Sequence, residues 1–479
     1  MKNQKTPKSE SCIYFVGIKG VAMTALALFL KERGNTVEGS DTSAIFPTDE
    51  LLISSHIPVK KGFSPDNIPD NCTKVIYTGA HGGQENPEVL EAMKRGIPCV
   101  SHGVALGSYM DDYRGISIAG CHGKTTTTAM TSKILTYAGL DPSYAIGCGI
   151  VSGLGFPGHS GHGEWFVAEA DEYITDPGRD MTPRFYWQKS EIFVVTNIDF
   201  DHPDVYQNLY DVQKTFTNYL QLNTKLKTLI YNENDEPSKI LNLGISKNVT
   251  TYSYGEKATA DFVISDIEKT RGTTSWTGIF RGKRVGRFSL RVPGIHNIYN
   301  ASAALLVGYA AGITWPVLKQ AIAAYEGSKR RFELIGESKT TRFYDDYAHH
   351  PTEINAILSA LRTWYPHEYI VAVFQPHTYS RTQALLTEFT QSFQNVDTVI
   401  ITDIYGSARE KDTGTVTGKT ITDAMQNIHS DARSAPTFSQ VSKILRTLKK
   451  TPDIVIFMGA GDIYNWEKHI VNQLKGMEV

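Results

Sequence analysis

The segment GCHGKT at residues 120–125 constrains this chain more than any other feature of its sequence. It follows the segment GISIA at 115–119, which predicts a short strand, and it precedes a run with helical spacing. A loop between a strand and a helix presents backbone N–H groups and a helix amino terminus to phosphates. The sequence therefore predicts a nucleotide-binding loop, although residue 118 is isoleucine where the full phosphate-loop pattern has glycine.

Several side chains around this loop suit nucleotide phosphates and a metal ion. In the phosphate-loop pattern Lys124 contacts the β- and γ-phosphates, and the Thr125 hydroxyl reaches Mg²⁺. EADE, which begins at Glu169, follows a predicted strand of the same segment, so Glu169 is a candidate for holding magnesium on ATP phosphates. TNIDFDH, which ends at His202, follows a later strand. His202 is either a ligand of a second metal ion or the cap of a loop, and the spacing does not decide between them.

A second glycine-containing turn, GIKGVA, starts at Gly17 after the apolar run 12–16. Gly20 and the acidic Asp41, about twenty residues further on, complete a pattern typical of dinucleotide binding. An ordinary turn in a parallel sheet explains these residues nearly as well. Any nucleotide diphosphate would satisfy the same geometry, so NAD is not implied.

Two neighbouring predicted strands of the last third end in polar residues. DDYAHHP spans 345–351 and FQPHTYSR spans 374–381. Tyrosine, adjacent histidines and an arginine suggest a site for a small carboxylate, which Arg381 would bind through two N–H groups. The alternative is a pair of helix caps with a surface arginine. Similarly, Asn297 and Asn300 either hydrogen-bond a purine or cap a helix, and capping is the default.

Strands alternate with helices in three successive segments, which predicts an α/β fold with parallel sheets. A single core rarely exceeds about 250–300 residues, and this chain has 479 residues. We therefore expect three domains, at 1–112, 113–327 and 328–479. β-Branched and aromatic residues with glycine turns at about 250–292 predict a small antiparallel addition to the middle domain.

Composition excludes several classes of protein. Basic and acidic residues nearly balance, with 48 and 50 of each and a net charge of -2, which argues against a nucleic-acid partner. The sequence has no apolar run of membrane-spanning length, and its first eleven residues lack the apolar stretch of a signal peptide. Five cysteines without zinc-like spacing suit reduced thiols. We expect a cytoplasmic protein with no membrane partner.

Taken together, these motifs resemble the Mur ligases of peptidoglycan synthesis. The resemblance is carried, in family order from residue 120 to 464, by GCHGKTTT, EADE, TNIDFDH, GIHNIYNASAA, KRRFE, DDYAHHPTE and MGAGDIY. It implies a Rossmann-like UDP-sugar domain, a central ATPase domain of the phosphate-loop type, and a Rossmann-like carboxyl-terminal domain that binds an amino acid. It also implies an enzyme that forms a C–N bond with ATP as co-substrate and Mg²⁺ as cofactor.

The resemblance implies a role for each residue that matches a family motif. The residues assigned to ATP are Gly120, His122, Gly123, Lys124, Thr125, Thr126, His296, Asn297, Arg331 and Asp346. The residues assigned to magnesium are Thr125, Glu169 and His202, and those assigned to the UDP-sugar are Gly17, Gly20 and Asp41. The amino acid would meet Tyr347, His349 and Arg381. Lys124, His349 and Arg381 are the candidate catalytic residues, and His349 is the first candidate for the base.

The family resemblance implies L-alanine as the acceptor, with a tripeptide as the alternative. L-Alanine, joined to UDP-N-acetylmuramate, is favoured by the motifs VGIKGVAM, DDYAHHPTEI, FQPHTYSRT and DIYGSARE. We expect the protein to be a monomer or a homodimer. The long stretch 173–190 instead favours attachment of a whole tripeptide. A non-catalytic UDP-sugar-binding protein is a more remote alternative. Each of the two glycine-containing loops differs from the family pattern at one position. Lys19 replaces a glycine in the first loop, and Cys121 replaces a threonine in the phosphate loop.

Overall fold

The computed structural model describes residues 11–406, 410, 412 and 414–475. Part of the polar amino-terminal segment and residues 407–409 of DIYGSARE therefore lie outside the described residues. The chain divides into two compact units. The first comprises Met1–Ile198, Gln213–Ser253 and Ala303–Ala321, and the second comprises Asp199–Val212, Tyr254–Ser302 and Ile322–Val479.

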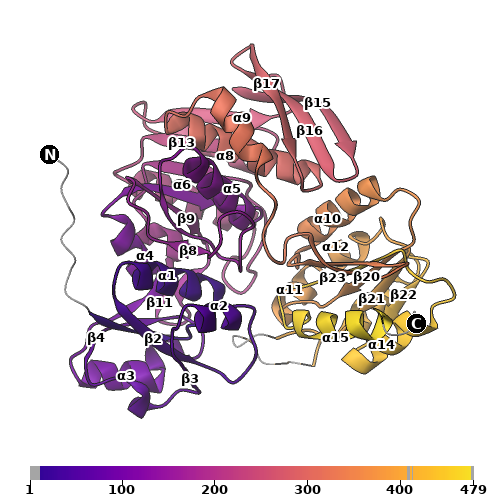
Figure 1. Ribbon diagram of the computed structural model, residues 1–479, viewed down its shortest axis with the longest axis horizontal. Helices are drawn as coiled ribbons and strands as arrows, with labels where there is room; N and C mark the ends of the chain where they lie inside the picture. Colours follow the sequence, from indigo (N-terminus) through magenta and orange to yellow (C-terminus); the bar gives the residue numbers. More distant parts are fainter. Residues whose placement is uncertain (1–10, 407–409, 411, 413, 476–479) are drawn as a thin grey trace. The chain divides into compact units, whose positions relative to one another are not determined.

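The first sheet of the first unit is parallel, with strand order β3-β2-β1-β4-β5 (Figure 1). Its strands are β1 (Cys12–Val16), β2 (Thr36–Asp41), β3 (Val59–Lys61), β4 (Cys72–Tyr77) and β5 (Cys99–Ser101). Helices α1 (Val21–Glu32), α2 (Asp49–Ser54) and α4 (His102–Met110) cover one face, and α3 (Pro87–Lys94) covers the other. Both faces are buried, which explains why all five residues of β1 are apolar.

The second sheet of the first unit carries the phosphate loop. Strand β6 (Arg114–Ala119) lies between β12 (Ile192–Val195) and β9 (Trp165–Ala170), and all three are parallel. Outside them lie β13 (Thr228–Asn232), β7 (Ser143–Ala145) and β8 (Gly158–His159). Helix α5 (Lys124–Tyr137) follows β6 directly. The expected strand–loop–helix arrangement is therefore confirmed, with Glu169 inside the end of β9 rather than after it.

The stretch 173–190 forms a compact addition to the first unit. Its elements are the antiparallel pair β10 (Ile174–Asp176) and β11 (Asp180–Pro183), followed by the 3₁₀ turn η3 (Arg184–Trp187). The hairpin contacts the loop after β4, where the Gln84 N–H donates to Asp176 Oδ2 at 3.0 Å. A Cβ on Gly107 of α4 would lie 2.1 Å from the Trp187 carbonyl oxygen, so α4 packs closely on η3.

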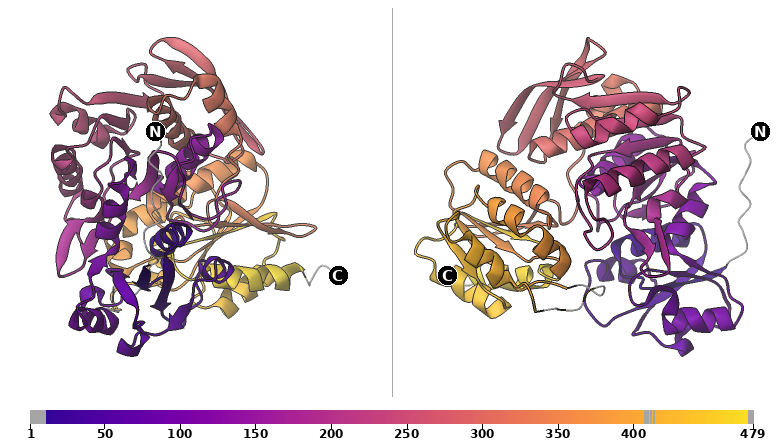
Figure 2. Two further views of the ribbon diagram at one scale, coloured as in Figure 1. Left: turned by 60° about the vertical axis from the view of Figure 1, so that its left-hand side comes forward. Right: turned by 180° about the vertical axis from the view of Figure 1, so that it is seen from behind.

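The expected antiparallel addition is present in the second unit. Strands β15 (Phe262–Thr270), β16 (Thr273–Phe280) and β17 (Lys283–Leu290) pair antiparallel, and they are the long pink arrows of Figure 2. The end of β14 (Thr250–Gly255) pairs parallel with β15. The middle segment therefore contains both parallel and antiparallel pairing.

The remaining sheet of the second unit has strand order β18-β19-β23-β20-β21-β22. Its strands are β18 (Glu333–Glu337), β19 (Arg342–Asp346), β20 (Ile370–Phe374), β21 (Thr398–Ile401), β22 (Ala432–Ser434) and β23 (Ile454–Met458). Only β18 pairs antiparallel among these described strands. Figure 1 shows α10 and α12 on one side of the strands and α14 and α15 on the other. The expected α/β fold with parallel sheets is confirmed.

The other helices and turns connect these sheets. On the carboxyl-terminal sheet they are α10 (Pro351–Trp364), α11 (Tyr379–Ala384), α12 (Leu386–Gln391), α13 (Gly418–Met425), α14 (Phe438–Thr447) and α15 (Tyr464–Lys475). Elsewhere they are η1 (Pro65–Asn67), η2 (Gly83–Glu85), α6 (Leu209–Leu222), α7 (Glu236–Lys239), η4 (Ile240–Gly244), α8 (Ile295–Ala310) and α9 (Trp315–Ala323). Within the described residues, every helix is too short or too polar to cross a membrane.

Candidate active site

The phosphate loop is fixed in shape by two residues that follow β12. The His122 N–H donates to Asn197 Oδ1 at 2.9 Å, and Asn197 Nδ2 donates to the His122 carbonyl at 2.9 Å. The Thr196 hydroxyl donates to the same carbonyl at 2.5 Å. Gly120 and Gly123 have φ of 124° and 81°, which is a region that glycine adopts readily. Sequence reasoning did not identify Thr196 or Asn197, although they begin the motif TNIDFDH.

Lys124 is held inside the loop by carbonyls and a carboxylate. Its Nζ donates to the Gly120 carbonyl at 2.7 Å and to Glu172 Oε2 at 2.9 Å. Burial alone would lower the pKa of Lys124, but the carboxylates of Glu172 and Asp171 outweigh it and raise that pKa. Lys124 therefore stays charged, and the nearly inaccessible Glu172 is its counter-ion. Glu172 was part of the EADE motif, but its pairing with Lys124 was not predicted.

The structure brings two of the three predicted magnesium residues together. The Thr125 hydroxyl donates to Glu169 Oε2 at 3.1 Å. The other carboxylate oxygen of Glu169 accepts the Gly147 N–H at 2.6 Å, which fixes the side chain in place. Thr126 is buried in the first turn of α5. The third predicted residue, His202, belongs to the second unit.

The predicted UDP-sugar residues line the first glycine turn. Gly17 has φ of 81°, and a Cβ there would lie 2.4 Å from Thr78 Cγ2, so this position requires glycine. Gly20 is the residue immediately before α1. The Asp41 carboxylate accepts the Lys19 N–H at 2.8 Å and the Thr42 N–H at 2.7 Å. Asp41 therefore braces the turn through backbone groups.

The unexpected Lys19 is held by the segment that follows β2. Its Nζ donates to the Ala44 carbonyl at 2.8 Å and lies 3.0 Å from Asp49 Oδ1. The ammonium also lies 5.6 Å from the centroid of the Phe46 ring. The Thr48 hydroxyl donates to the Lys19 carbonyl at 2.5 Å. Lys19 thus ties residues 44–49 to the glycine turn.

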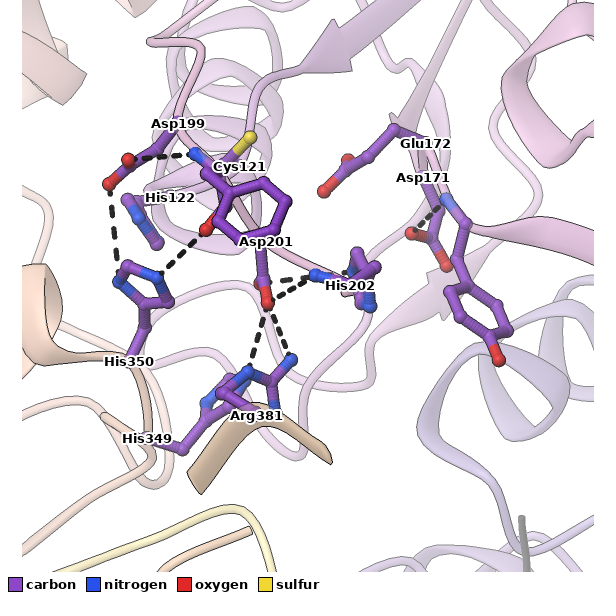
Figure 3. Close-up of polar contacts among 12 residues, drawn as sticks. Cys121, His122, Asp171, Glu172, Asp199, Asp201, His202, His349, His350 and Arg381 are labelled. Carbon is purple, nitrogen blue, oxygen red and sulfur yellow. Dashed lines mark hydrogen bonds and ion pairs between the residues drawn. The ribbon is translucent and has the colours of Figure 1, made fainter. Parts of the chain in front are cut away.

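Arg381, the predicted carboxylate receptor, is buried and paired within the second unit. Its Nε and Nη2 both donate to Asp201 Oδ1, at 2.9 and 2.8 Å (Figure 3). The arginine is only 4% exposed, so the alternative of a surface arginine is wrong. Burial would raise the pKa of Asp201, but the nearby His202 and Arg381 hold it well below its usual range. The same carboxylate accepts the His202 N–H at 2.7 Å.

Tyr347 and His349 lie together at the end of β19. His349 Nδ1 lies 3.0 Å from the Tyr347 carbonyl, which can only accept, so Nδ1 carries the proton and Nε2 has a free lone pair. Burial lowers the pKa of His349 to about 4, with Glu353 opposing and Arg381 assisting. The guanidinium of Arg331 lies 5.1 Å from the centroid of the Tyr347 ring. The imidazole of His349 is therefore neutral at neutral pH.

Asp346 connects this strand end to the segment that precedes β18. Its two oxygens accept the Ala348 and Phe332 N–H groups, each at 2.8 Å. Burial raises the pKa of Asp346 to about 6, although Arg331 opposes this shift. The side chain is 4% exposed. Both of these hydrogen bonds join Asp346 to the backbone of its own unit.

A cavity of about 240 Å³ lies beside His296, between α10, the start of α8 and Lys269 of β15. His296 Nδ1 and the Trp364 Nε1 at its wall have no hydrogen-bond partner among the described residues. Burial lowers the pKa of His296 to about 4, so its ring is neutral. Asn297 donates to the Pro293 carbonyl at 2.7 Å and accepts from Asn300 at 3.3 Å. These asparagines secure the start of α8.

Three family models match the chain in succession. Residues 12–114 match the Mur ligase family catalytic domain, 118–308 match the Mur ligase middle domain, and 330–461 match the Mur ligase glutamate ligase domain. Two curated relatives, both named UDP-N-acetylmuramate--L-alanine ligase, come from Caldanaerobacter subterraneus subsp. tengcongensis and Alkaliphilus metalliredigens. Each is 38% identical, over 94% of this chain and 95% of its own length.

Solved structures agree. The UDP-N-acetylmuramate-alanine ligase MurC of Thermotoga maritima superimposes with a TM-score of 0.80 at 26% identity, covering 97% of this chain and 99% of its own. A murein peptide ligase of Psychrobacter arcticus has a TM-score of 0.73 at 22% identity, with the same coverage, and shares the fold. With full-length relatives at this identity and three matching domains in order, the chain belongs to the Mur ligase family.

Proposed function

We propose that this chain joins L-alanine to the lactyl carboxylate of UDP-N-acetylmuramate, converting ATP to ADP and phosphate. The observation that carries this proposal is the 38% identity, over 94% of the chain, to proteins named for that reaction. The chain is therefore an ATP-dependent amide-forming ligase. Attachment of a tripeptide is less supported, because the relatives at 38% identity are named for L-alanine.

In the first unit, the phosphate loop would hold the ATP phosphates. The charged Lys124 would stabilise negative charge on the transferred phosphoryl group. Thr125 and Glu169 fit Mg²⁺, because their oxygens lie 3.1 Å apart and magnesium prefers oxygen ligands. We assign a second ion to His202. Bound magnesium would neutralise charge on the phosphate oxygens.

The UDP moiety would lie against the first glycine turn. Gly17 and Gly20 leave room for a pyrophosphate to approach the backbone. Asp41 would accept a ribose hydroxyl with the oxygen lone pairs that its two backbone bonds leave available. Lys19 supports this proposal, because its contacts with residues 44–49 hold that segment against the glycine turn.

The adenine would bind in the cavity beside His296. A volume of about 240 Å³ holds a purine, and the unpartnered nitrogens of His296 and Trp364 would meet its polar edge. Asn297 would support the cavity from α8. Arg331, beside the Tyr347 ring, and Asp346, the last residue of β19, would reach the nucleotide's phosphates and ribose.

The amino acid would bind at the end of β19. Arg381 would receive its carboxylate, sharing N–H donors with or replacing Asp201, and Tyr347 would lie beside it. The ammonium of alanine must lose a proton before it can attack. His349 is our candidate acceptor, because its Nε2 lone pair is available while Nδ1–H is held by the Tyr347 carbonyl.

The proposed reaction then has two chemical steps. A lactyl carboxylate oxygen attacks the γ-phosphorus, the bond to the bridging oxygen breaks, and ADP leaves. The deprotonated alanine nitrogen attacks the acyl carbon, and as the tetrahedral intermediate collapses its C–O bond to phosphate breaks and the departing phosphate takes the second N–H proton. Positioning of the three reactants supplies much of the rate.

The remaining features of the proposal concern organisation. We place the domain boundaries near residues 112 and 327. We assign the protein to the cytoplasm, where its proposed nucleotide substrates are made. A monomer and a homodimer both remain compatible with the proposed reaction.

An acceptor panel tests the proposal. Purified protein with UDP-N-acetylmuramate, ATP and Mg²⁺ receives L-alanine, glycine, L-serine or the tripeptide, and phosphate release and product mass are followed. We expect turnover with L-alanine and, in Lys124→Ala, loss of turnover with an unchanged far-UV CD spectrum. Ligation of the tripeptide alone would overturn the proposal in favour of the recycling activity. Absence of ATP turnover with every acceptor would indicate a binding protein.

A further inference from the structure

A buried arginine supports the strand end that carries Tyr347. The guanidinium of Arg330 lies between two rings, 5.2 Å from the centroid of Tyr347 and 4.9 Å from that of Tyr464 on α15. Its Nε donates to Asp345 Oδ2 at 3.0 Å, and its Nη2 donates to the Gly459 carbonyl at 2.6 Å. Its own carbonyl accepts the Tyr347 N–H at 2.8 Å. Arg330 therefore contacts Tyr347 through both its backbone and its side chain.

Two buried carboxyl groups act on this arginine, Asp345 through the hydrogen bond above and Glu467 through its charge, and each has an oxygen without a partner among the described residues. Asp345 is 1% exposed and Glu467 is 5% exposed. Asp345 Oδ1 and Glu467 Oε2 have no hydrogen-bond partner among the described residues. Glu467 lies one turn after Tyr464, so both project from the same face of α15 toward Arg330. A buried carboxylate oxygen without a hydrogen bond costs about 1–3 kcal/mol, so two of them beside one cation indicate a shared proton.

The surrounding charges also favour a proton on Glu467. Burial, then the negative charge of Asp345, raise the pKa of Glu467 to about 9, while Arg330 opposes the shift. Glu333 on β18 adds to the rise and Lys468 on α15 opposes it. Burial also raises the pKa of Asp345, although Arg330 and Lys329 oppose this shift, and the Asp462 and Tyr405 groups act on Tyr464. The amino terminus of α15 favours an anion, but burial outweighs it.

We propose that Glu467 is a positioning residue for the amino-acid site. As a neutral carboxylic acid it donates its proton to Asp345 Oδ1, and the bridged pair carries one negative charge that matches Arg330. Arg330 is thereby fixed against Tyr347, which the proposed function assigns to alanine binding. Since the inference rests on that function, its test is confined to a protein with measurable L-alanine ligation.

Three variants separate a proton bridge from a merely structural side chain. Glu467→Gln keeps the size and an N–H donor, so we expect kcat/KM for L-alanine within about twofold of wild type. Glu467→Leu leaves Asp345 Oδ1 without a donor, and we expect the KM for L-alanine to rise about tenfold, with the KM for UDP-N-acetylmuramate unchanged. Gln473→Leu, on the same helix but bonded to Ser442, is the matched control with wild-type constants.

The pH profile tests the proton itself. The ratio of wild-type to Glu467→Gln kcat/KM cancels the titration of the alanine amine. We expect this ratio to be constant at pH 7–8 and to fall above about pH 9, where only wild-type protein acquires a second buried negative charge. The infrared carbonyl band of a protonated carboxyl should be present in wild type at pH 8 and absent in Glu467→Gln.

Three results would overturn the inference while leaving the proposed function intact. The first is an unchanged KM for L-alanine in Glu467→Leu, and the second is an equal loss in Glu467→Gln. The third is absence of the infrared band together with activity that depends on a monovalent cation, which would place a cation between the carboxylates. Absence of L-alanine ligation in wild type would instead refute the proposed function.

Discussion

Asn197 offers a sharp test of the phosphate loop, because it bonds both backbone groups of His122. Asn197→Ala removes a donor and an acceptor, each bond at 2.9 Å. A typical hydrogen bond contributes about 1 kcal/mol net, so the loop conformation should lose about 2 kcal/mol. The Thr196 hydroxyl still caps the His122 carbonyl, which limits the loss. If ATP binds only this conformation, its apparent affinity should fall about 30-fold.

The assay is direct titration with a non-hydrolysable ATP analogue, followed by KM for ATP and for L-alanine. We expect the analogue affinity and the KM for ATP to change together, with the KM for L-alanine within about twofold of wild type. Asn223→Ala is the matched control, because that side chain donates to the Ser190 carbonyl at 2.9 Å away from the phosphate loop. Equal losses of ATP affinity in the two variants would show that general destabilisation, rather than loop shape, is responsible.

Two further outcomes follow from other contacts. Lys19→Met removes the ion pair with Asp49, worth about 1 kcal/mol, so the KM for UDP-N-acetylmuramate should rise about fivefold. Lys60→Met, which loses only a bond to the Asn67 carbonyl, should leave that KM unchanged. The pKa of His349 is about 4 in the folded protein and 6.5 in the unfolded chain, so folding loses stability as pH falls between these values. Between pH 7 and pH 5 the free energy of unfolding, measured in urea, should therefore fall by about 2 kcal/mol less in His349→Asn than in wild type. An equal fall in the two proteins would contradict the neutral ring assigned to His349.

Local patterns were sufficient to predict the elements and the phosphate loop. The strand before Gly120 and the helix after Thr125 were predicted from neighbouring residues alone, and the structure confirms both. Glu169 was placed correctly near Thr125, because the carboxyl ends of adjacent parallel strands meet at one edge of a sheet. The alternation of strands and helices likewise predicted the α/β class.

Partners that depend on long-range packing were not predictable. Glu172 lies 48 residues from Lys124, and Asp201 lies 180 residues from Arg381. No periodicity links such pairs, since they form only when separate strands bring their ends together. Arg381 could equally have been a surface arginine until its burial was known. The motifs therefore identified the functional side chains but not the oppositely charged residues with which they pair.

Those pairings also explain how a nearly neutral chain can be built for anionic substrates. Three cations at the proposed substrate sites already have a resident carboxylate: Lys124 has Glu172, Arg381 has Asp201, and Lys19 has Asp49. A buried cation without a partner costs about 3–5 kcal/mol, so such pairing keeps the substrate-free protein stable. It also weakens each site for small inorganic anions, because an entering anion must share or displace a well-bonded carboxylate. Only a substrate held at several points can meet that cost, so local pairing favours the complete substrate over its fragments.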